Sequence, residues 1–212
     1  MSFTDLLHIV GDEPVFDTGF LAADTTSATA LPGQLDRWRR AGKILQLRRG
    51  LYALAPPYRK TYPQPFLVAN RMSPGSYVSG VAALAHYGAI PETVFEVTSC
   101  GPGRPCRRHT PLGRFSYRFL KPALRTGYRR LELAGPQYAF VATPEKAFLD
   151  LAWFHPDGDN PAWIDELRLD LEAFSSGALR AAADATGSPK LMRAACYLAS
   201  QVDDPALRYE PL

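Results

Sequence analysis

The sequence has 212 residues, of which 46% are hydrophobic and 21% charged, so it can bury the core of one large domain or two modest ones. No apolar run approaches the roughly 20 residues that span a bilayer, and the start MSFTDLLHIVGDEP lacks the features of a signal peptide. We therefore expect a cytoplasmic protein without a membrane partner. Cys100, Cys106 and Cys196 are not spaced as zinc ligands, which predicts reduced thiols, no metal site and no cofactor.

The formal net charge of +3 hides a strong segregation of sign along the chain. Residues 1–36 hold six acids and no base, residues 37–130 hold eighteen bases and two acids, and residues 143–212 hold six bases and twelve acids. A concentrated positive field attracts polyanions whatever the total charge is. The basic middle therefore predicts one surface for nucleic acid and another surface for a different partner.

The first 42 residues predict three short helices. Residues 2–10 carry apolar side chains at helical spacing, and a second helix follows the possible caps Asp17 and Thr18, with Phe20 and Leu21 on its buried side. The third helix is expected from about Pro32 to the stop at Gly42, with Ser27 or Thr29 as cap candidates. Its inward face is predicted to consist of three residues at i, i+4 and i+7: Leu31, Leu35 and Trp38.

The opposite face of this third helix carries the side chains that suit a DNA major groove. If Leu35 and Trp38 point inward, Arg37 and Arg40 point outward, with Gln34 and Arg39 on the flanks. Arginine can donate two hydrogen bonds to guanine, and glutamine can pair similarly with adenine. Beyond the helix, we expect phosphate contacts from Lys43, Arg48 and Arg49. No role is assigned to Asp36.

The segment KILQLRRGLYAL predicts a two-stranded hairpin directly after the helix. Ile44 and Gln46 alternate with Leu45 and Leu47, and the turn is Arg48-Arg49-Gly50. A helix, a tight stop and a basic hairpin in this order predict a winged helix-turn-helix rather than a solvated charged face. Prolines between residues 55 and 65 indicate a domain boundary, which divides the chain into residues 1–58 and residues 59–212.

The second part predicts a mixed α/β domain with an antiparallel-rich sheet and C-terminal helices. Helices are expected at 65–72 and 79–87, where His86 has a structural role, and strands at 93–99, 114–120, 128–133 and 138–142. In the second strand, Phe115, Tyr117 and Phe119 would face the core and leave a basic open side. A second DNA-contacting surface is predicted here, with solvated strands or an acidic protein partner as equal alternatives; its residues are Arg104, Arg107, Arg108, Arg114 and Arg118.

The last third predicts helices. Thr143, Pro144 and Glu145 are typical of a helix start, and we interpret Glu145 and Lys146 as capping residues rather than as parts of a nuclease site. Further helices are expected at 163–174, 178–185 and 189–202. Their outer face would be acidic, from Asp165, Glu166, Asp170 and Glu172.

Several phrases together resemble the AbiEi-type antitoxins, the abortive-infection family of type IV toxin–antitoxin systems. They are LDRWRRAGKILQLRRGLYAL, YVSGVAALAHYGAIPETVFEVTS, GRFSYRFLKP and ATPEKAFLDLAW, within residues 31–154. The resemblance implies an N-terminal winged helix-turn-helix and an α/β antitoxin domain. It implies an autorepressor that binds inverted repeats in double-stranded DNA and opposes a nucleotidyltransferase-like toxin, usually without a stable complex. The family's basic recognition-helix and wing positions correspond to Arg37, Arg39, Arg40, Lys43, Arg48 and Arg49.

Two other functions remain open from the sequence. One is a free-standing transcription regulator without a toxin, whose second domain senses a ligand or mediates pairing. The other is a small metal-dependent nuclease or nucleotide-modifying enzyme that uses Glu145, Lys146, Asp150 or His109. We find no phosphate-cradling glycine loop, no metal-ligand spacing and no nucleophile with a base partner, so we expect that the protein is not an enzyme.

Overall fold

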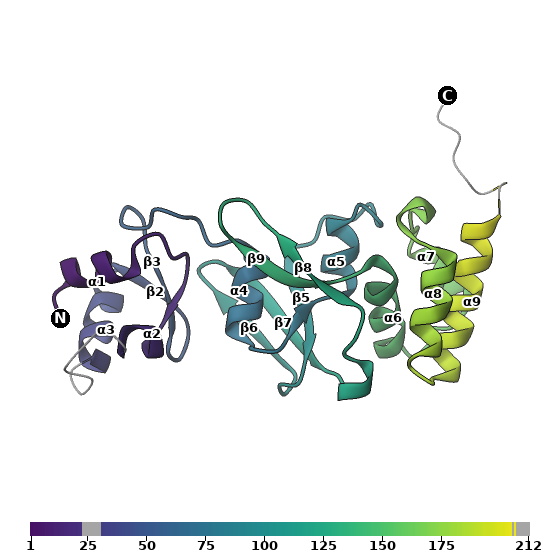
Figure 1. The fold of residues 1–212 in the computed structure, drawn as a ribbon, viewed down its shortest axis with the longest axis horizontal. Coiled ribbons are helices and arrows are strands. Elements are labelled where there is room, and N and C mark those ends of the chain that lie inside the picture. Colours follow the sequence, from purple (N-terminus) through teal and green to yellow (C-terminus); the bar gives the residue numbers. More distant parts are fainter. Residues whose placement is uncertain (23–30, 205, 207–212) are drawn as a thin grey trace, which may run out of the picture.

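Two β-sheets organise the computed structural model, which describes residues 1–22, 31–204 and 206. The small sheet has the strand order β1-β3-β2, and the large sheet has the order β6-β7-β5-β4-β9-β8. Figure 1 shows the small sheet near the N-terminal end, the large sheet in the middle and helices α6 to α9 at the other end. The predicted mixed α/β class is therefore confirmed. In the large sheet the antiparallel pairs are β4–β5, β6–β7 and β8–β9, and the parallel pairs are β4–β9 and β5–β7.

The N-terminal elements follow the predicted order of three helices and a hairpin. They are α1 (Phe3–Val10), β1 (Phe16–Asp17), α2 (Thr18–Ala22), α3 (Leu31–Arg40), β2 (Ile44–Arg48) and β3 (Leu51–Leu54). Helix α1 begins with a capping box, because the Ser2 side chain accepts from Asp5 N and the Asp5 carboxylate accepts from Ser2 N. The predicted cap candidates of α3, Ser27 and Thr29, lie outside the described residues.

The three helices pack on one face of the small sheet. Leu31, Leu35 and Trp38 of α3 are buried, as predicted, and they join residues of α1, β2 and β3 in one hydrophobic cluster. Phe20 was expected in this core but is 44% exposed, whereas Leu21 is fully buried. Helix α2 has only five residues, so it presents a single narrow face to the core, and Leu21 occupies that face.

Strand β3 is buried on both faces. Tyr52 and Leu54 belong to the cluster under α1 and α3, whereas Leu51 and Ala53 belong to the larger cluster that contains helix α4 (Pro65–Met72). Successive side chains of a strand point to opposite faces, so this short strand serves both cores. The division into residues 1–58 and residues 59–212 stays a prediction, and these two parts share hydrophobic contacts across β3.

The large sheet combines elements that were predicted with strands that were not. Helix α4 and strand β9 (Tyr138–Ala142) have the predicted bounds, and α5 (Gly80–His86), β5 (Glu96–Gly101), β7 (Gly113–Phe119) and β8 (Tyr128–Glu132) lie close to theirs. Strands β4 (Tyr77–Val78) and β6 (Cys106–Thr110) were not predicted. Residues 104–108 were expected to form a loop, but β6 pairs antiparallel with β7 over Cys106–Thr110. Backbone pairing stabilises this edge strand even though its side chains are mostly exposed.

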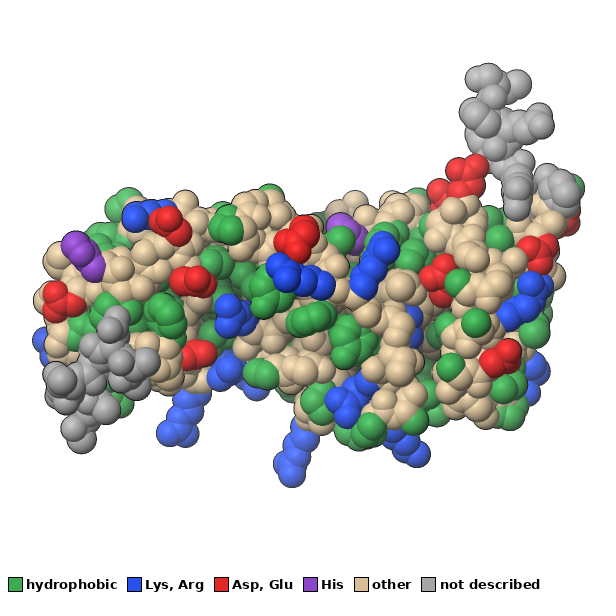
Figure 2. All heavy atoms as spheres, in the orientation of Figure 1, with side chains coloured by type: hydrophobic (Ala, Val, Ile, Leu, Met, Phe, Trp, Pro, Cys, Tyr) green, Lys and Arg blue, Asp and Glu red, His purple; other side chains and the backbone are tan. Residues whose placement is uncertain are grey.

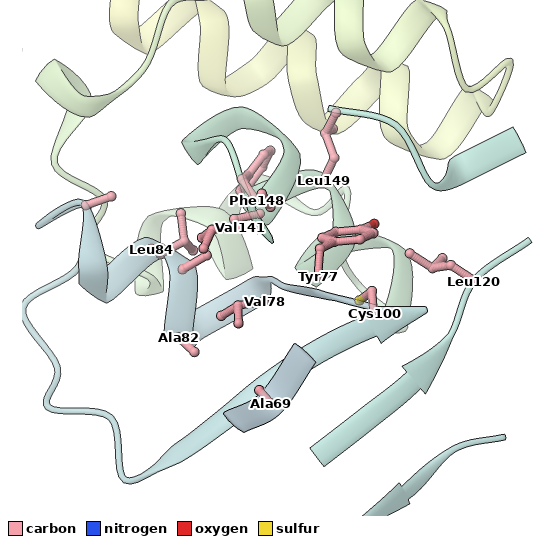
Figure 3. Close-up of a cluster of buried hydrophobic side chains, with 14 of the residues drawn as sticks. Ala69, Tyr77, Val78, Ala82, Leu84, Cys100, Leu120, Val141, Phe148 and Leu149 are labelled. Carbon is pink, nitrogen blue, oxygen red and sulfur yellow. The ribbon is translucent and has the colours of Figure 1, made fainter. Parts of the chain in front are cut away.

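Figure 3 shows the centre of the larger core, in which Tyr77 and Val78 of β4 and Cys100 of β5 share one cluster of buried side chains with Phe148 and Leu149. The last two residues belong to helix α6 (Pro144–Phe154), which packs most extensively against α5. In β7, Phe115 and Tyr117 are buried as predicted. Phe119 is 46% exposed, contrary to expectation, because it is the last residue of its strand.

The C-terminal region consists of α7 (Pro161–Glu166), a 3-10 turn η3 (Leu171–Ala173), α8 (Ser176–Asp184) and α9 (Pro189–Asp203). A second 3-10 turn, η2 (Pro122–Leu124), lies between β7 and β8. The single helix predicted over 163–174 is wrong, since Arg168 adopts φ 49° and Asp170 caps η3 instead. Among the described residues, no helix has both the length and the apolar character needed to cross a bilayer.

Candidate nucleic-acid interface

The outer face of α3 carries the predicted row of cations. Arg37, Arg39 and Arg40 are exposed and Gln34 is half-buried, whereas Leu35 and Trp38 point into the core. This orientation follows from the 100° step per residue, which places Arg37 and Arg40 opposite Leu35 and Trp38 and leaves Gln34 and Arg39 on the flanks of the helix. The α3 face therefore presents guanidinium groups to the outside at the N-terminal end of the molecule (Figure 1).

Asp36 pairs with two of these arginines. Its Oδ1 lies 2.7 Å from Nη2 of Arg39, and its Oδ2 lies 2.6 Å from Nη2 of Arg40. The hydrogen bond from Arg39 lowers the pKa of the Asp36 carboxyl below its ordinary value. Within the described part of the chain, Arg37 has no carboxylate partner, so it is the cation of this face most available to a ligand.

The basic residues of the hairpin point in different directions. Arg49 is exposed at the turn, next to Gly50 with φ +79°, which a turn of this kind requires. Arg48 is half-buried and donates to the carbonyl oxygens of Arg49, at 2.9 Å, and Arg71, at 3.4 Å. Nζ of Lys43 lies 4.5 Å from the centre of the Phe3 ring in α1. Arg48 and Lys43 are thus engaged with the chain itself, whereas Arg49 projects freely.

A cavity of about 600 Å³ separates α3 from the hairpin turn. Its lining includes Gln46 and Tyr52 of the strands and the charged residues Asp36, Arg39 and Arg49. The cavity brings a helix cation and a hairpin cation to opposite sides of one concave surface.

The second predicted basic surface is divided by the pleat of the large sheet. Directly paired residues of a ladder point to the same face, so Arg107 shares a face with its partner Ser116, and Arg108 shares the other face with Phe115. Arg114 and Arg118 alternate with Phe115 and Tyr117, and therefore lie on the Arg107 face. Arg104 is exposed in the loop before β6.

Figure 2 shows Lys and Arg side chains projecting from the lower edge of the molecule, below the β2–β3 hairpin and the large sheet. The acidic residues of the C-terminal helices, Asp165, Glu166, Asp170 and Glu172, are exposed as predicted. These helices lie at the opposite end from α3 (Figure 1), so they do not cover its arginines.

A buried polar cluster forms around Lys146 and Asp150 on the inward side of α6, and it was not predicted from the sequence. Nζ of Lys146 lies 2.5 Å from Oδ1 of Asp150 and 2.6 Å from the carbonyl oxygen of Leu124. Oδ2 of Asp150 accepts from Ser79 at 2.7 Å and from Tyr77 at 2.9 Å. Spacing of i, i+4 on a helix was the only available signal for the ion pair.

The capping interpretation is therefore right for Thr143 and wrong for the Lys146 side chain. Oγ1 of Thr143 accepts from Lys146 N, but the ammonium is turned into the core toward Asp150. Burial raises the pKa of Asp150 above its ordinary value, although the ion pair and the hydrogen bonds oppose this shift. Burial and the nearby Asp150 charge likewise raise the pKa of Tyr77.

The residues considered for an enzyme do not converge on one site. Glu145 accepts a hydrogen bond from Ser175 N at 3.2 Å, and His109 is exposed on β6, the edge strand of the large sheet. Lys146 and Asp150 are paired in the core. Over residues 1–22, 31–204 and 206, no group of three or more His, Cys, Asp or Glu side chains is arranged to hold a metal ion.

The fold is similar to that in the crystal structure of the RV2827C protein from Mycobacterium tuberculosis. The TM-score is 0.56 and the sequence identity is 20%, over 99% of this chain and 80% of that chain. At this identity the similarity concerns the fold alone. No protein-family model matches the sequence, and no curated protein matches it significantly.

Proposed function

We propose that the protein is a DNA-binding repressor whose residues 1–58 act as a winged helix-turn-helix. In this proposal α3 enters the major groove, and the β2–β3 hairpin lies along the sugar-phosphate backbone. The observation that supports it best is the outer face of α3, where Arg37, Arg39 and Arg40 are exposed at the end of the molecule remote from the acidic helices. The cavity between α3 and the hairpin gives this end a concave surface.

The side chains of the proposed interface differ in how many intramolecular contacts they must break before they bind DNA. Arg37 and Arg49 can meet DNA as they stand, because neither has a carboxylate partner among the described residues. Arg39 and Arg40 must first exchange Asp36 for a base edge or a phosphate. Gln34 would read a base, and Lys43 and Arg48 would reach phosphates only after leaving their present contacts.

The biological role that we propose is that of an antitoxin in a type IV toxin–antitoxin system. The protein would repress its own operon from inverted repeats and counteract a nucleotidyltransferase-like toxin in the cytoplasm, with or without a stable complex. It would do so without enzymatic activity or a cofactor. This part of the proposal is supported by the resemblance of residues 31–154 to the AbiEi-type antitoxins.

The DNA interface is tested by binding of operator DNA at several salt concentrations. Neutralisation of about six to eight phosphates predicts a slope of about −5 to −7 for log affinity against log salt. We expect Arg37→Gln to weaken the preference for operator over unrelated DNA, and Arg49→Gln to weaken both alike. Arg180→Gln is the matched control, because Arg180 is an exposed arginine of α8 that pairs with Asp203. A slope near zero contradicts DNA binding altogether.

The antitoxin role is tested by co-expression with the adjacent gene, scored as rescue of growth. Rescue by the full chain, retained in an Arg37→Gln/Arg49→Gln double variant, would show that neutralisation does not require repression. A free-standing regulator is the second function, and it predicts that no nucleotidyltransferase-like gene lies beside this one. Failure to rescue growth from such a toxin would contradict the antitoxin role while leaving DNA binding intact.

A further inference from the structure

A groove of about 670 Å³ lies on the face of the large sheet that carries Arg107 and Arg118. We call it the Arg118 groove. The residues that shape it are Thr98, Pro105, Arg107, Ser116, Arg118 and Phe154. Its volume is within the range of about 300–1,000 Å³ that is usual for sites of small ligands.

The floor of the Arg118 groove is polar. Thr98 and Ser116 are paired across β5 and β7, and their hydroxyl oxygens lie 3.4 Å apart. Both point to the same face of the sheet as Arg107 and Arg118. Hydroxyl donors between two guanidinium groups form a suitable setting for the oxygens of a phosphate.

The charge of the groove is positive. The guanidinium carbon of Arg118 lies 4.8 Å from the centre of the Phe154 ring, and Arg118 has no carboxylate partner within the part of the chain that the structure describes. Arg107 approaches Glu96 with a long Nε to Oε1 distance of 3.6 Å, and the Arg107 side chain is 76% exposed. Arg114, on the same face, is exposed. Within the lining of the groove, the carboxylate of Glu96 therefore faces two arginines, Arg107 and Arg118.

The groove also has apolar walls. Phe154, at the end of α6, forms one side, and Pro105, just before β6, contributes to another. A smaller cavity of about 90 Å³ shares Thr98, Arg118 and Phe154 with the groove and extends to the buried Asp150. The groove thus combines hydroxyl and guanidinium groups with the aromatic side chain of Phe154.

We propose that the Arg118 groove binds a free mononucleotide, whose phosphate lies between Arg107 and Arg118 and whose ring packs along Phe154. The phosphate oxygens accept from the two guanidinium groups and from the hydroxyls of Thr98 and Ser116. This site lies on the large sheet, away from α3, and it does not depend on DNA binding by the N-terminal end.

The test is calorimetric titration of the full chain with the four ribonucleoside 5′-monophosphates, with adenosine and with inorganic phosphate. We expect at least one monophosphate to bind with a dissociation constant below about 1 mM, and both partial ligands to bind at least about tenfold more weakly. Arg118→Gln should weaken this binding about tenfold or more, and Arg180→Gln should leave it unchanged. Circular dichroism confirms that each variant is folded.

Three results would overturn the proposal. They are no binding of any monophosphate at about 5 mM, equal binding of inorganic phosphate, and tighter binding of a short single-stranded oligonucleotide than of every monophosphate. A fourth measurement separates this site from the DNA interface. Arg118→Gln should bind operator DNA as the wild type does, and a loss as large as that of Arg37→Gln would assign the groove to DNA instead.

Discussion

Lys146→Met would test whether the buried ion pair of α6 holds the core together. The side chains of Lys146 and Asp150 are 6% and 3% exposed, so removal of the ammonium leaves a carboxylate in the core whose remaining donors, among the residues that the structure describes, are Tyr77 and Ser79. Loss of one partner of a buried pair typically costs about 3–5 kcal/mol. For a chain of this size, this corresponds to a melting temperature lowered by about 6–20 °C.

The assay is urea unfolding followed by circular dichroism, with Arg180→Gln as the control. Arg180 and Asp203 form an exposed pair, with side chains 45% and 49% exposed, and loss of such a pair costs about 0–1 kcal/mol. If Lys146→Met falls within about 1 kcal/mol of the wild type, the pair does not stabilise the core as argued.

The cost of Lys146→Met should also depend on pH. Without the ammonium, burial of Asp150 is less opposed, and its pKa in the folded state rises further above the ordinary value of 3.8. The folded variant then binds a proton that the unfolded chain releases, so the added instability is full above the folded pKa and shrinks as the pH falls. The difference in unfolding free energy from the wild type should be smaller at about pH 5 than at about pH 8. An equal difference at both pH values would contradict an unpaired carboxylate as the cause.

Two further changes follow from the contacts described above. Asp36→Asn should release Arg39 and Arg40 and so raise the affinity for DNA. The slope of log affinity against log salt should become steeper by about one to two. Lower affinity for operator DNA in a gel-shift titration would instead show that Asp36 itself reads a base. Gly127→Ala should destabilise the fold by about 1–3 kcal/mol, because φ is +75° and the new Cβ would lie 3.1 Å from Cβ of Lys146. Gly187→Ala is its control, with φ +64° but no atom within 4 Å, and equal losses of unfolding free energy for the two variants would rule out crowding at Lys146.

Local patterns in the sequence predicted the elements with clear boundaries. Helix α4 begins at Pro65, a residue favoured in the first turn, and β9 lies between the turn near Gly135 and the cap Thr143, so both have the predicted bounds. The inward face of α3 followed from the spacing of Leu31, Leu35 and Trp38. These features depend on neighbours within a few residues along the chain.

Features that depend on distant partners could not be predicted in the same way. Strand β6 looks like a polar loop, because its pairing with β7, and not its side-chain pattern, makes it a strand. The Asp150 cluster joins residues 71 and 73 positions apart, so the sequence offers the i, i+4 spacing of Lys146 and Asp150 but does not indicate that the pair is buried or that Tyr77 and Ser79 join it. The Arg118 groove likewise requires the register between β5, β6 and β7.

The double burial of β3 limits how the N-terminal region can be separated from the rest. A fragment ending near residue 58 would expose Val15, Leu47, Leu51 and Ala53, which now contribute to the larger hydrophobic cluster. Such an exposed hydrophobic patch would favour self-association of the fragment. Exchange of this region between homologous chains would therefore require matched substitutions on both sides of the strand. A chimaera without them would be poorly soluble even though the arginines of its α3 face were unchanged.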